Sequence, residues 1–359
     1  MKGPQSQDSS LPISRRKALR TGGLAALGAL LARPRSSKAE LTPSGFRAAA
    51  QYSAAHTGVA FLVSKDEHVI FEDYPNGHSA YEAHKIYSGT KGFWILAGLK
   101  AVEEGIIDLD ARVAETIPEW NGESGKSRVT LRQLLSFSSG LDPAFNLHND
   151  GFENRDAIAI RTPLVAQPGA AFIYGPAALQ VFHEVLKRKL ASRGETPTKY
   201  LEHKVLRPLG LGPQRYLADR EGNPLLATGF MLSARQWVKM GHLILNGGSP
   251  VVSPHLLSSC FRGSSANCAF GMGFWNNAMA GESSARELDV EDMLEPKWYR
   301  QDWHNVCLCR TAPPDLVASV GSGYQRLYVI PSLHLVIVRQ GNFGRISDAE
   351  LLRLALGKA

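Results

Sequence analysis

The segment His84–Val102, HKIYSGTKGFWILAGLKAV, places a serine and, three residues later, a lysine at the start of an apolar run with the character of a helix. Residues three apart lie on one face of a helix, so Ser88 and Lys91 are expected to touch. At the amino end of the helix, unpaired N–H groups and the helix dipole favour a negative charge that develops near Ser88. The segment therefore raises the question whether Ser88 is a helix cap or a nucleophile.

The surroundings of Lys91 bear on that question. Desolvation against the apolar residues that follow is expected to lower the lysine pKa from about 10.4, which makes a neutral amine accessible. A neutral amine can take the hydroxyl proton of Ser88 and so activate it for attack on a carbonyl. The alternative is that Ser88 only caps the helix and that Lys91 extends to water. This segment alone leaves both interpretations open.

The charge of the chain is concentrated at its amino end. The chain has 359 residues and a formal net charge of +7. Residues 1–39 hold eight basic residues and one acidic residue, whereas residues 40–359 hold 32 of each. A body without net charge gives no electrostatic basis for nucleic acid as a partner.

Residues 1–39 have the features of an export signal. The twin arginines Arg15 and Arg16 precede a weakly apolar run over 22–32, and residues 37–39 form a small-x-small cleavage pattern. The leader resembles a twin-arginine signal, although Ala18 stands where that consensus usually has Phe. Its apolar run of 11 residues is shorter than the roughly 20 that span a bilayer. We expect an exported, periplasmic protein without stable membrane insertion; the alternative is a disordered basic tail.

The four cysteines all fall within residues 260–309: Cys260, Cys268, Cys307 and Cys309. An exported chain meets an oxidising compartment, where disulfides form, but the sequence cannot choose among the three full pairings, and reduced, packed thiols are equally compatible with it. A Cys-x-Cys pair without further cysteine or histidine spacing is a poor zinc signal, so we expect no metal and no cofactor.

Strand signals occur near both ends of the chain and helix signals between them. Segments rich in β-branched or apolar residues predict strands over 58–64, 68–74, 306–310, 324–330 and 333–340. Caps and apolar periodicity predict helices over 130–135, 176–193, 233–245 and 347–356. Two early strands alone would form a poor sheet. One α/β sheet domain (40–105 and 231–359) with a helical insertion (106–230) is therefore favoured over two sequential domains.

Two further segments carry candidate site residues. Tyr174 stands at a sharp turn before a predicted helix, and a phenol near a lysine can pass a proton to a leaving group. Ser319–Gly323 precedes a predicted strand, where glycines let a substrate lie against a sheet edge and a backbone N–H hold an oxyanion. The alternatives are a tyrosine packed at a helix entry and a plain β-bulge.

Six segments occur in one chain order that resembles the serine β-lactamase-like family, especially its class C β-lactamase, esterase and nylon-oligomer hydrolase branch. They are Ser88–Lys91, Thr130–Leu141, Pro168–Tyr174, Thr228–Arg235, Phe270–Trp275 and Gly321–Gln340. The resemblance covers about residues 50 to 345. It implies a β-lactamase/transpeptidase-like α/β fold: an antiparallel sheet flanked by helices, an inserted mostly helical domain, and a site between the two.

The resemblance also implies roles for individual residues. Ser88 would be the nucleophile, Lys91 its base and Tyr174 the proton relay. The backbone N–H groups of Ser88 and Ser322 would form the oxyanion hole, and Ser319, Gly321 and Gly323 would contact the substrate. The expected partner is a small-molecule ester or amide, and the oligomeric state is not readable from the sequence.

Two departures from the family pattern bear on the substrate. Pro176 stands where the family often has an Asn whose amide contacts the lysine and the substrate, and proline has neither that amide nor an N–H. The late triplet, often Lys-Thr-Gly or His-x-Gly, is Ser319-Val320-Gly321 here and lacks a cation. Without a charge-assisted contact, selection for substrate carboxylates should weaken.

Three functions follow from these observations. The favoured one is an exported serine hydrolase that cleaves an ester or amide through a Ser88 acyl-enzyme. The second is a β-lactamase or D-alanyl-D-alanine carboxypeptidase, and the third is a binding or sensing protein that keeps the fold without turnover. No Gly-x-Ser-x-Gly elbow and no His-Glu-x-x-His motif occurs, so α/β-hydrolases and zincins are not supported.

Overall fold

The computed structural model describes residues 41–358. The predicted export leader, 1–39, lies outside these residues, so export stays a prediction. Within the described range, no helix combines the length and the apolar character that crossing a bilayer requires.

The centre of the fold is a six-stranded antiparallel sheet with the order β2-β1-β10-β9-β8-β5. Its strands are β1 (Gly58–Lys65), β2 (His68–Asp73), β5 (Trp275–Asn276), β8 (Val317–Gly321), β9 (Gln325–Ile330) and β10 (Leu335–Gly341). The buried strand β1 pairs with β10, with Leu62 opposite Val338, so segments from the two ends of the chain meet in the middle of the sheet. This confirms the predicted antiparallel sheet fold.

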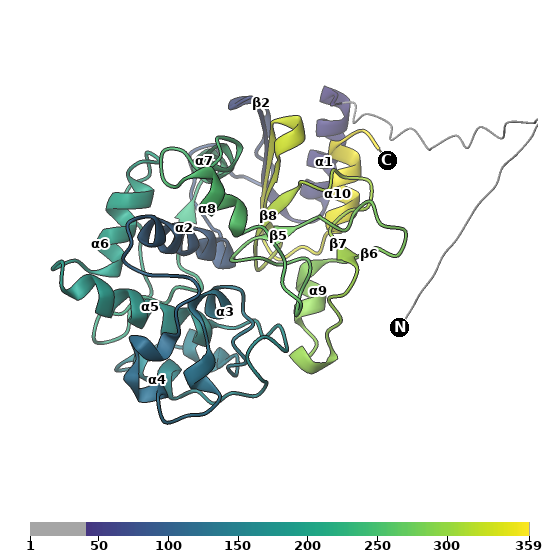
Figure 1. Cartoon of the computed structure of the whole chain (residues 1–359). Coiled ribbons are helices and arrows are strands. Elements are labelled where there is room, and N and C mark those ends of the chain that lie inside the picture. Colours follow the sequence, from purple (N-terminus) through teal and green to yellow (C-terminus); the bar gives the residue numbers. More distant parts are fainter. Residues whose placement is uncertain (1–40, 359) are drawn as a thin grey trace, which may run out of the picture. The chain divides into compact units, whose positions relative to one another are not determined.

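Helices cover both faces of this sheet (Figure 1). On one face lie α1 (Pro43–Ala55) and α10 (Asp348–Ala355), which pack on each other; on the other lies α7 (Ala234–Leu245). At Gly241 of α7, an added Cβ would lie 2.4 Å from Val336 of β10, so the glycine permits close helix–sheet packing. Ser233 and Ser347 cap α7 and α10, as the sequence predicts.

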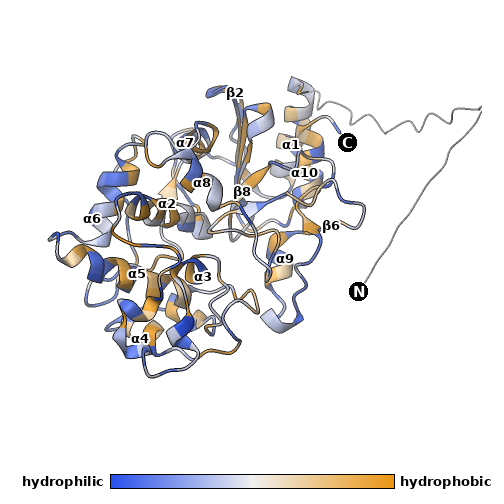
Figure 2. Ribbon diagram, in the orientation of Figure 1, coloured by the Kyte–Doolittle hydropathy of each residue, from blue (hydrophilic) through white to orange (hydrophobic). Residues whose placement is uncertain are grey.

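The region between the early and late strands is mostly helical. Its longer elements are α2 (Thr90–Glu103), α3 (Leu131–Leu135), α4 (Arg155–Arg161), α5 (Pro176–Ala191) and α6 (Pro197–Leu201). Helix α2 is apolar along most of its length (Figure 2), and its residues from Thr90 to Leu99 are all buried. A fully buried helix is held by packing around its whole circumference, which fixes the residues at its amino end. The predicted division at 106 and 230 stays a prediction.

Shorter elements complete the described chain: β3 (His84–Lys85), β4 (Met231–Leu232), α8 (Pro254–Ser259), β6 (Arg286–Glu287), α9 (Val290–Leu294) and β7 (Val306–Cys307). The strand predicted over 306–310 is thus wrong beyond Cys307, and β7 pairs with β6 outside the main sheet. The reason is a side chain: Asn277 Oδ1 accepts the N–H groups of Leu308 (2.9 Å) and Cys309 (3.0 Å), which a sheet neighbour would otherwise take.

All four cysteines are unbonded, and Cys260, Cys307 and Cys309 are buried. The structure therefore has the reduced, packed arrangement among the alternatives that the sequence leaves open.

Candidate active site

Ser88 and Lys91 meet at the amino end of α2. Ser88 lies in the 3-10 turn Tyr87–Gly89, directly before the helix. Lys91 Nζ lies 2.7 Å from Ser88 Oγ and donates a second hydrogen bond to the carbonyl of Ala227, at 2.9 Å. Tyr87 has a φ of 45°, in the left-handed region that a bulky residue rarely adopts. Such strain is typical of functional sites, and here it shapes the turn that presents the serine.

Lys91 is only 3% exposed, and its place in the core changes its acidity. Burial lowers the pKa of Lys91 to about 7, because the charged ammonium loses its hydration. Near pH 7, Lys91 is then a neutral amine in a large fraction of the molecules, and its nitrogen lies within reach of the Ser88 hydroxyl. This is the arrangement that a serine needs to lose its proton to a neighbouring base.

Tyr174 comes from the turn before α5 and joins this pair. Lys91 Nζ lies 4.8 Å from the centre of the Tyr174 ring. Desolvation raises the pKa of Tyr174 to about 12, and the Ser88 hydroxyl partly offsets this rise. The phenol therefore keeps its proton at neutral pH and can donate it. All three side chains line one cleft of about 960 Å³.

The end of the strand β8 brings Ser322 to the same cleft. Ser322, the first residue after β8, lines the cleft together with Ser88. A Cβ at Gly321 would lie 2.0 Å from the carbonyl oxygen of Ile86, so only glycine lets β8 approach the turn that holds Ser88 this closely. Among residues 41–358, neither the Ser88 nor the Ser322 backbone N–H donates to another backbone group. Their role as an oxyanion hole stays a prediction.

Three predicted substrate contacts lie beside the cleft and not among the residues that line it. Ser319 is 2% exposed within β8, and its hydroxyl has no hydrogen-bond partner in the described chain. Gly321 packs its backbone against Ile86, and the N–H of Gly323 donates to Glu291. Of this segment the structure brings only Ser322 into the cleft, and direct substrate contact by the other three stays a prediction.

The sequence patterns did not predict which residues form two of the walls of the cleft. One wall comes from the loop after α3 and the other from α9 and the turn that follows it; their side chains include Asp142, Phe145, His148, Glu291, Leu294, Glu295, Lys297, Trp298 and Tyr299. These residues belong to irregular segments and a five-residue helix, where periodicity does not report which side chains converge. Phe145 and Tyr299 are each more than half exposed, so the cleft offers aromatic surface at its rim.

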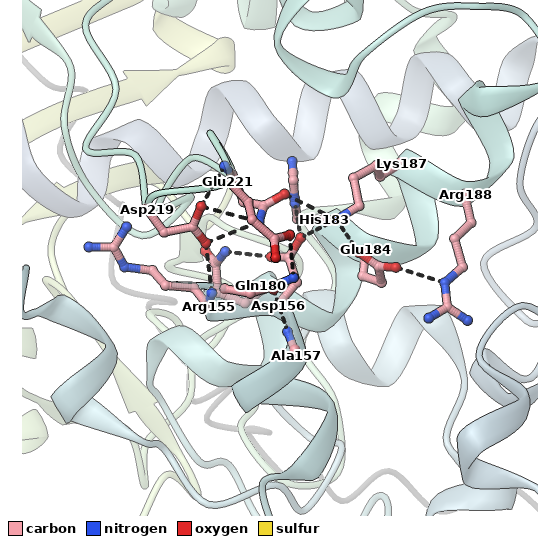
Figure 3. Close-up of polar contacts among 12 residues, drawn as sticks. Arg155, Asp156, Ala157, Gln180, His183, Glu184, Lys187, Arg188, Asp219 and Glu221 are labelled. Atoms are coloured by element: carbon pink, nitrogen blue, oxygen red, sulfur yellow. Dashed lines mark hydrogen bonds and ion pairs between the residues drawn. The ribbon is translucent and has the colours of Figure 1, made fainter. Parts of the chain in front are cut away.

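A buried polar network that includes Gln180 and Asp156 (Figure 3) lies next to the carbonyl that binds Lys91. Gln180 of α5 accepts the N–H of Leu226 at 2.9 Å and donates to the carbonyl of Pro224 at 3.0 Å. The carbonyl of Ala227, one residue further, is the one that Lys91 contacts. Gln180 also donates to Asp156 at 2.9 Å. Because these groups are fully buried and paired, the segment that orients Lys91 is rigidly held.

The charge at Asp156 is balanced within the same network. His183 Nδ1 lies 2.7 Å and Lys187 Nζ 3.0 Å from Asp156 Oδ2 (Figure 3). Burial raises the pKa of Asp156, and the hydrogen bond and electrostatic interaction with His183, together with Lys187, outweigh this effect, so its pKa lies below the usual value. The network cross-links α4, α5 and the segment before Ala227, and it lies behind the site.

Comparison with known proteins assigns the family. The family model described as Beta-lactamase matches residues 46–242, more than half of the chain. The chain belongs to the Beta-lactamase family. This confirms the resemblance that the sequence motifs indicate, and it places Ser88, Lys91 and Tyr174 inside the matched range.

Solved structures of this fold include proteins described as enzymes of several activities. EstCE1, described as a hydrolase with promiscuous acyltransferase activity, has a TM-score of 0.64 at 16% identity over 88% of this chain and 98% of its own. A family VIII carboxylesterase has a TM-score of 0.61 at 17% identity over 89% and 99%. A D-stereospecific amidohydrolase from Streptomyces has a TM-score of 0.60 at 17% identity over 86% and 97%. At these identities the likeness shows the shared fold.

Curated relatives match over a shorter range. Monacolin J acid methylbutanoyltransferase from Aspergillus terreus is 27% identical over 154 residues, 35% of this chain and 36% of its own. An acyltransferase from Penicillium decumbens is 28% identical over 117 residues, 25% and 28% of the two chains. The chain thus spans about a third of the length of the curated relatives it matches. Family and fold together support an enzyme of the hydrolase and transferase type.

Both departures from the family pattern are visible in the site. Pro176 is the first residue of α5 and lines the cleft without an amide, and the described contacts of Lys91 are with Ser88 and the Ala227 carbonyl. The late triplet lies on β8 and brings no cation to the cleft.

His304 is exposed and pairs with Asp302 at 2.9 Å, outside the cleft lining. Within residues 41–358, no group of three or more potential metal ligands is present.

Proposed function

We propose that this protein is a serine hydrolase that cleaves an ester or amide bond through an acyl-enzyme on Ser88. The observation that carries the proposal is the 2.7 Å contact between Ser88 Oγ and the buried amine of Lys91. Burial brings the pKa of Lys91 to about 7, so its amine is often neutral and can serve as a base for the adjacent hydroxyl.

The proposed reaction proceeds in two halves. In the first, neutral Lys91 takes the Ser88 proton as Oγ attacks the substrate carbonyl, and the oxyanion that forms accepts hydrogen bonds from the N–H groups of Ser88 and Ser322. As the intermediate collapses, Tyr174 donates its proton to the leaving alcohol or amine and is reprotonated from Lys91. In the second half, water loses a proton along the same route in reverse and attacks the ester, releasing the acid and restoring Ser88.

The charges along the cleft support a substrate without a required carboxylate. The late triplet has no cation, and Asp142, Glu291 and Glu295 line the cleft, with Lys297 and Lys91 as its lysines. A carboxylate-bearing β-lactam or a peptide C-terminus would find no charge-assisted partner on β8. We therefore favour an ester or amide hydrolase over a β-lactamase or a D-alanyl-D-alanine carboxypeptidase. The contact between Ser88 and Lys91 favours an enzyme over a non-catalytic binding protein.

Water need not be the acceptor in every turnover. The curated relatives include acyltransferases, and EstCE1 is described as a hydrolase with promiscuous acyltransferase activity. The same acyl-enzyme would transfer its acyl group to an alcohol that enters the cleft. The predicted leader would deliver this activity to the periplasm.

Active-site labelling tests the proposal. A fluorophosphonate probe should label the purified wild-type protein, and Ser88→Ala should abolish the label. Ser322→Ala is the matched control within the same cleft: it removes the other serine hydroxyl and keeps the backbone N–H, so labelling should persist. A folded wild-type protein that takes up no probe would leave only the binding-protein alternative.

The substrate class is tested separately. Hydrolysis of p-nitrophenyl butyrate should exceed that of a carboxylate-bearing β-lactam in kcat/KM. If the β-lactam is instead the best substrate, the argument from the missing cation is wrong.

A further inference from the structure

The turn between β8 and β9 has an unusual backbone conformation. Gly323 and Tyr324 both have positive φ values, 74° and 60°. In a turn, successive backbone N–H groups can point into one concavity that binds an anion. For Tyr324, which has a side chain, the conformation is strained and persists only where the surroundings hold it.

The carboxylate of Glu291 fills this concavity. Its two oxygens accept the N–H groups of Gly323 and Tyr324, each at 2.8 Å. Arg326 Nη1 pairs with the same carboxylate at 3.2 Å, and Arg326 is fixed in turn by Asp348, at 2.6 Å. The Glu291 side chain is 20% exposed, so these contacts are largely shielded from water.

The carbonyl side of the turn is held as firmly. Arg339 Nη1 donates to the carbonyls of Gly323 (3.2 Å) and Tyr324 (2.7 Å). Gln325 Nε2 donates to the carbonyl of Gly323 at 2.9 Å and to that of Ser322 at 3.3 Å. The backbone groups of Gly323 and Tyr324 are thus held between an anion and a cation. Ser322, the residue before them, lines the cleft, and its N–H donates to no backbone acceptor in the described chain.

We propose that Glu291 is the positioning residue of the oxyanion hole: by anchoring Gly323 and Tyr324, it fixes the direction of the Ser322 N–H. This inference rests on the proposed function, because it assigns Glu291 a part in the same acylation step. In this role Glu291 acts through Ser322, because its carboxylate is held by the backbone N–H groups of Gly323 and Tyr324. Each carboxylate oxygen of Glu291 accepts one backbone N–H of the turn, so the side chain restrains the turn at two points.

Three variants test this role. Glu291→Ala removes both acceptors, and Glu291→Gln keeps one, because an amide has a single acceptor oxygen. Asp292→Asn is the matched control: Asp292 is the next carboxylate on α9, and it contacts Arg345 and the Tyr324 hydroxyl instead of the turn backbone. The readouts are kcat and KM for p-nitrophenyl butyrate and the inhibition constant of butylboronic acid, whose tetrahedral adduct on Ser88 places an oxygen in the oxyanion position.

A misdirected oxyanion donor weakens the transition state and leaves substrate binding nearly unchanged. We expect Glu291→Ala to lower kcat by about 10- to 100-fold and to weaken the boronic acid by a similar factor, with KM within about twofold. Glu291→Gln should show a smaller loss of the same kind, and Asp292→Asn should match the wild type. Thermal unfolding of each variant checks the fold, and if Glu291→Ala does not fold, Glu291→Gln decides.

The outcomes separate this inference from the proposed function. The wild type could hydrolyse the ester while the folded Glu291 variants keep a kcat and a boronic-acid affinity within twofold of it. That result would overturn the anchoring role and leave the proposed function intact. A rise in KM without a change in kcat would also overturn it, because Glu291 would then be a substrate contact. A wild type that neither hydrolyses the ester nor binds the boronic acid would overturn the proposed function and this inference with it.

Discussion

At Lys91, stability and reactivity oppose each other. The Lys91 side chain is only 3% exposed, and its two hydrogen bonds replace the lost hydration only in part. The charged ammonium form is therefore less stable in the folded protein than in water. The same desolvation brings its pKa to about 7 and makes the amine a base. The proposed chemistry therefore depends on a residue that burdens the core, as is common at functional sites.

The pH dependence of acylation follows from this lysine. Lys91 is protonated below a pH of about 7 and cannot then accept the Ser88 proton; above it the amine is neutral, so kcat/KM should rise through pH 7 and level off. Tyr174, with its pKa raised to about 12, stays protonated up to pH 9 and should cause no decline. Rates with p-nitrophenyl butyrate between pH 5 and 9, corrected with Ser88→Ala, measure this. A rate that is still rising at pH 9, without a plateau, would show that Lys91 is not desolvated or not the base.

The sequence predicted part of this site at the level of residues. The i, i+3 spacing was enough to predict contact between Ser88 and Lys91, because both lie on one helical turn. The position of Tyr174 depended on the family resemblance, since no local pattern relates it to α2. Glu291 could not be found, because its partners follow it by more than thirty residues and the link is made by backbone N–H groups, which leave no trace in residue type.

Among the elements, the approach of β8 to the turn Tyr87–Gly89 decides the geometry of the oxyanion hole. We expect Gly321→Ala to lower kcat at least about 10-fold and to lower Tm, because its Cβ would lie 2.0 Å from the Ile86 carbonyl oxygen and force the two elements apart. Gly122→Ala is the control, since a Cβ there meets nothing within 4 Å. Steady-state kinetics and thermal unfolding measure both effects. Full activity of Gly321→Ala would mean that this spacing is not critical.

Elements were predictable where caps and periodicity agreed. Thr130 and Ser233 each form a capping box at the start of the predicted helix. The strand over 306–310 failed because the Asn277 side chain takes the backbone N–H groups, a tertiary contact that strand propensity cannot show. Helix α1 went unpredicted although Thr42 caps it and Pro43 begins it, so the signal was present in the sequence.

At the scale of the whole molecule, the sheet joins both ends of the chain, and the site depends on this closure. Ser88 follows the first two strands, whereas Ser322 lies between the last ones, so the nucleophile and the second oxyanion donor meet only when β1 pairs with β10. The order of strand and helix signals was enough to predict this arrangement, since early strands without partners are unstable alone. Export by the leader remains a prediction, to be checked by fractionating cells that carry Arg15 and Arg16 or lysines in their place.

The central claim, an acyl-enzyme on Ser88, is tested most directly by acid-quenching the protein within its first turnovers of p-nitrophenyl butyrate and measuring its intact mass. The account predicts a butyryl increment that maps to the peptide containing Ser88 and is absent from Ser88→Ala. Turnover without any adduct at early times, or an adduct on a different residue, would contradict it.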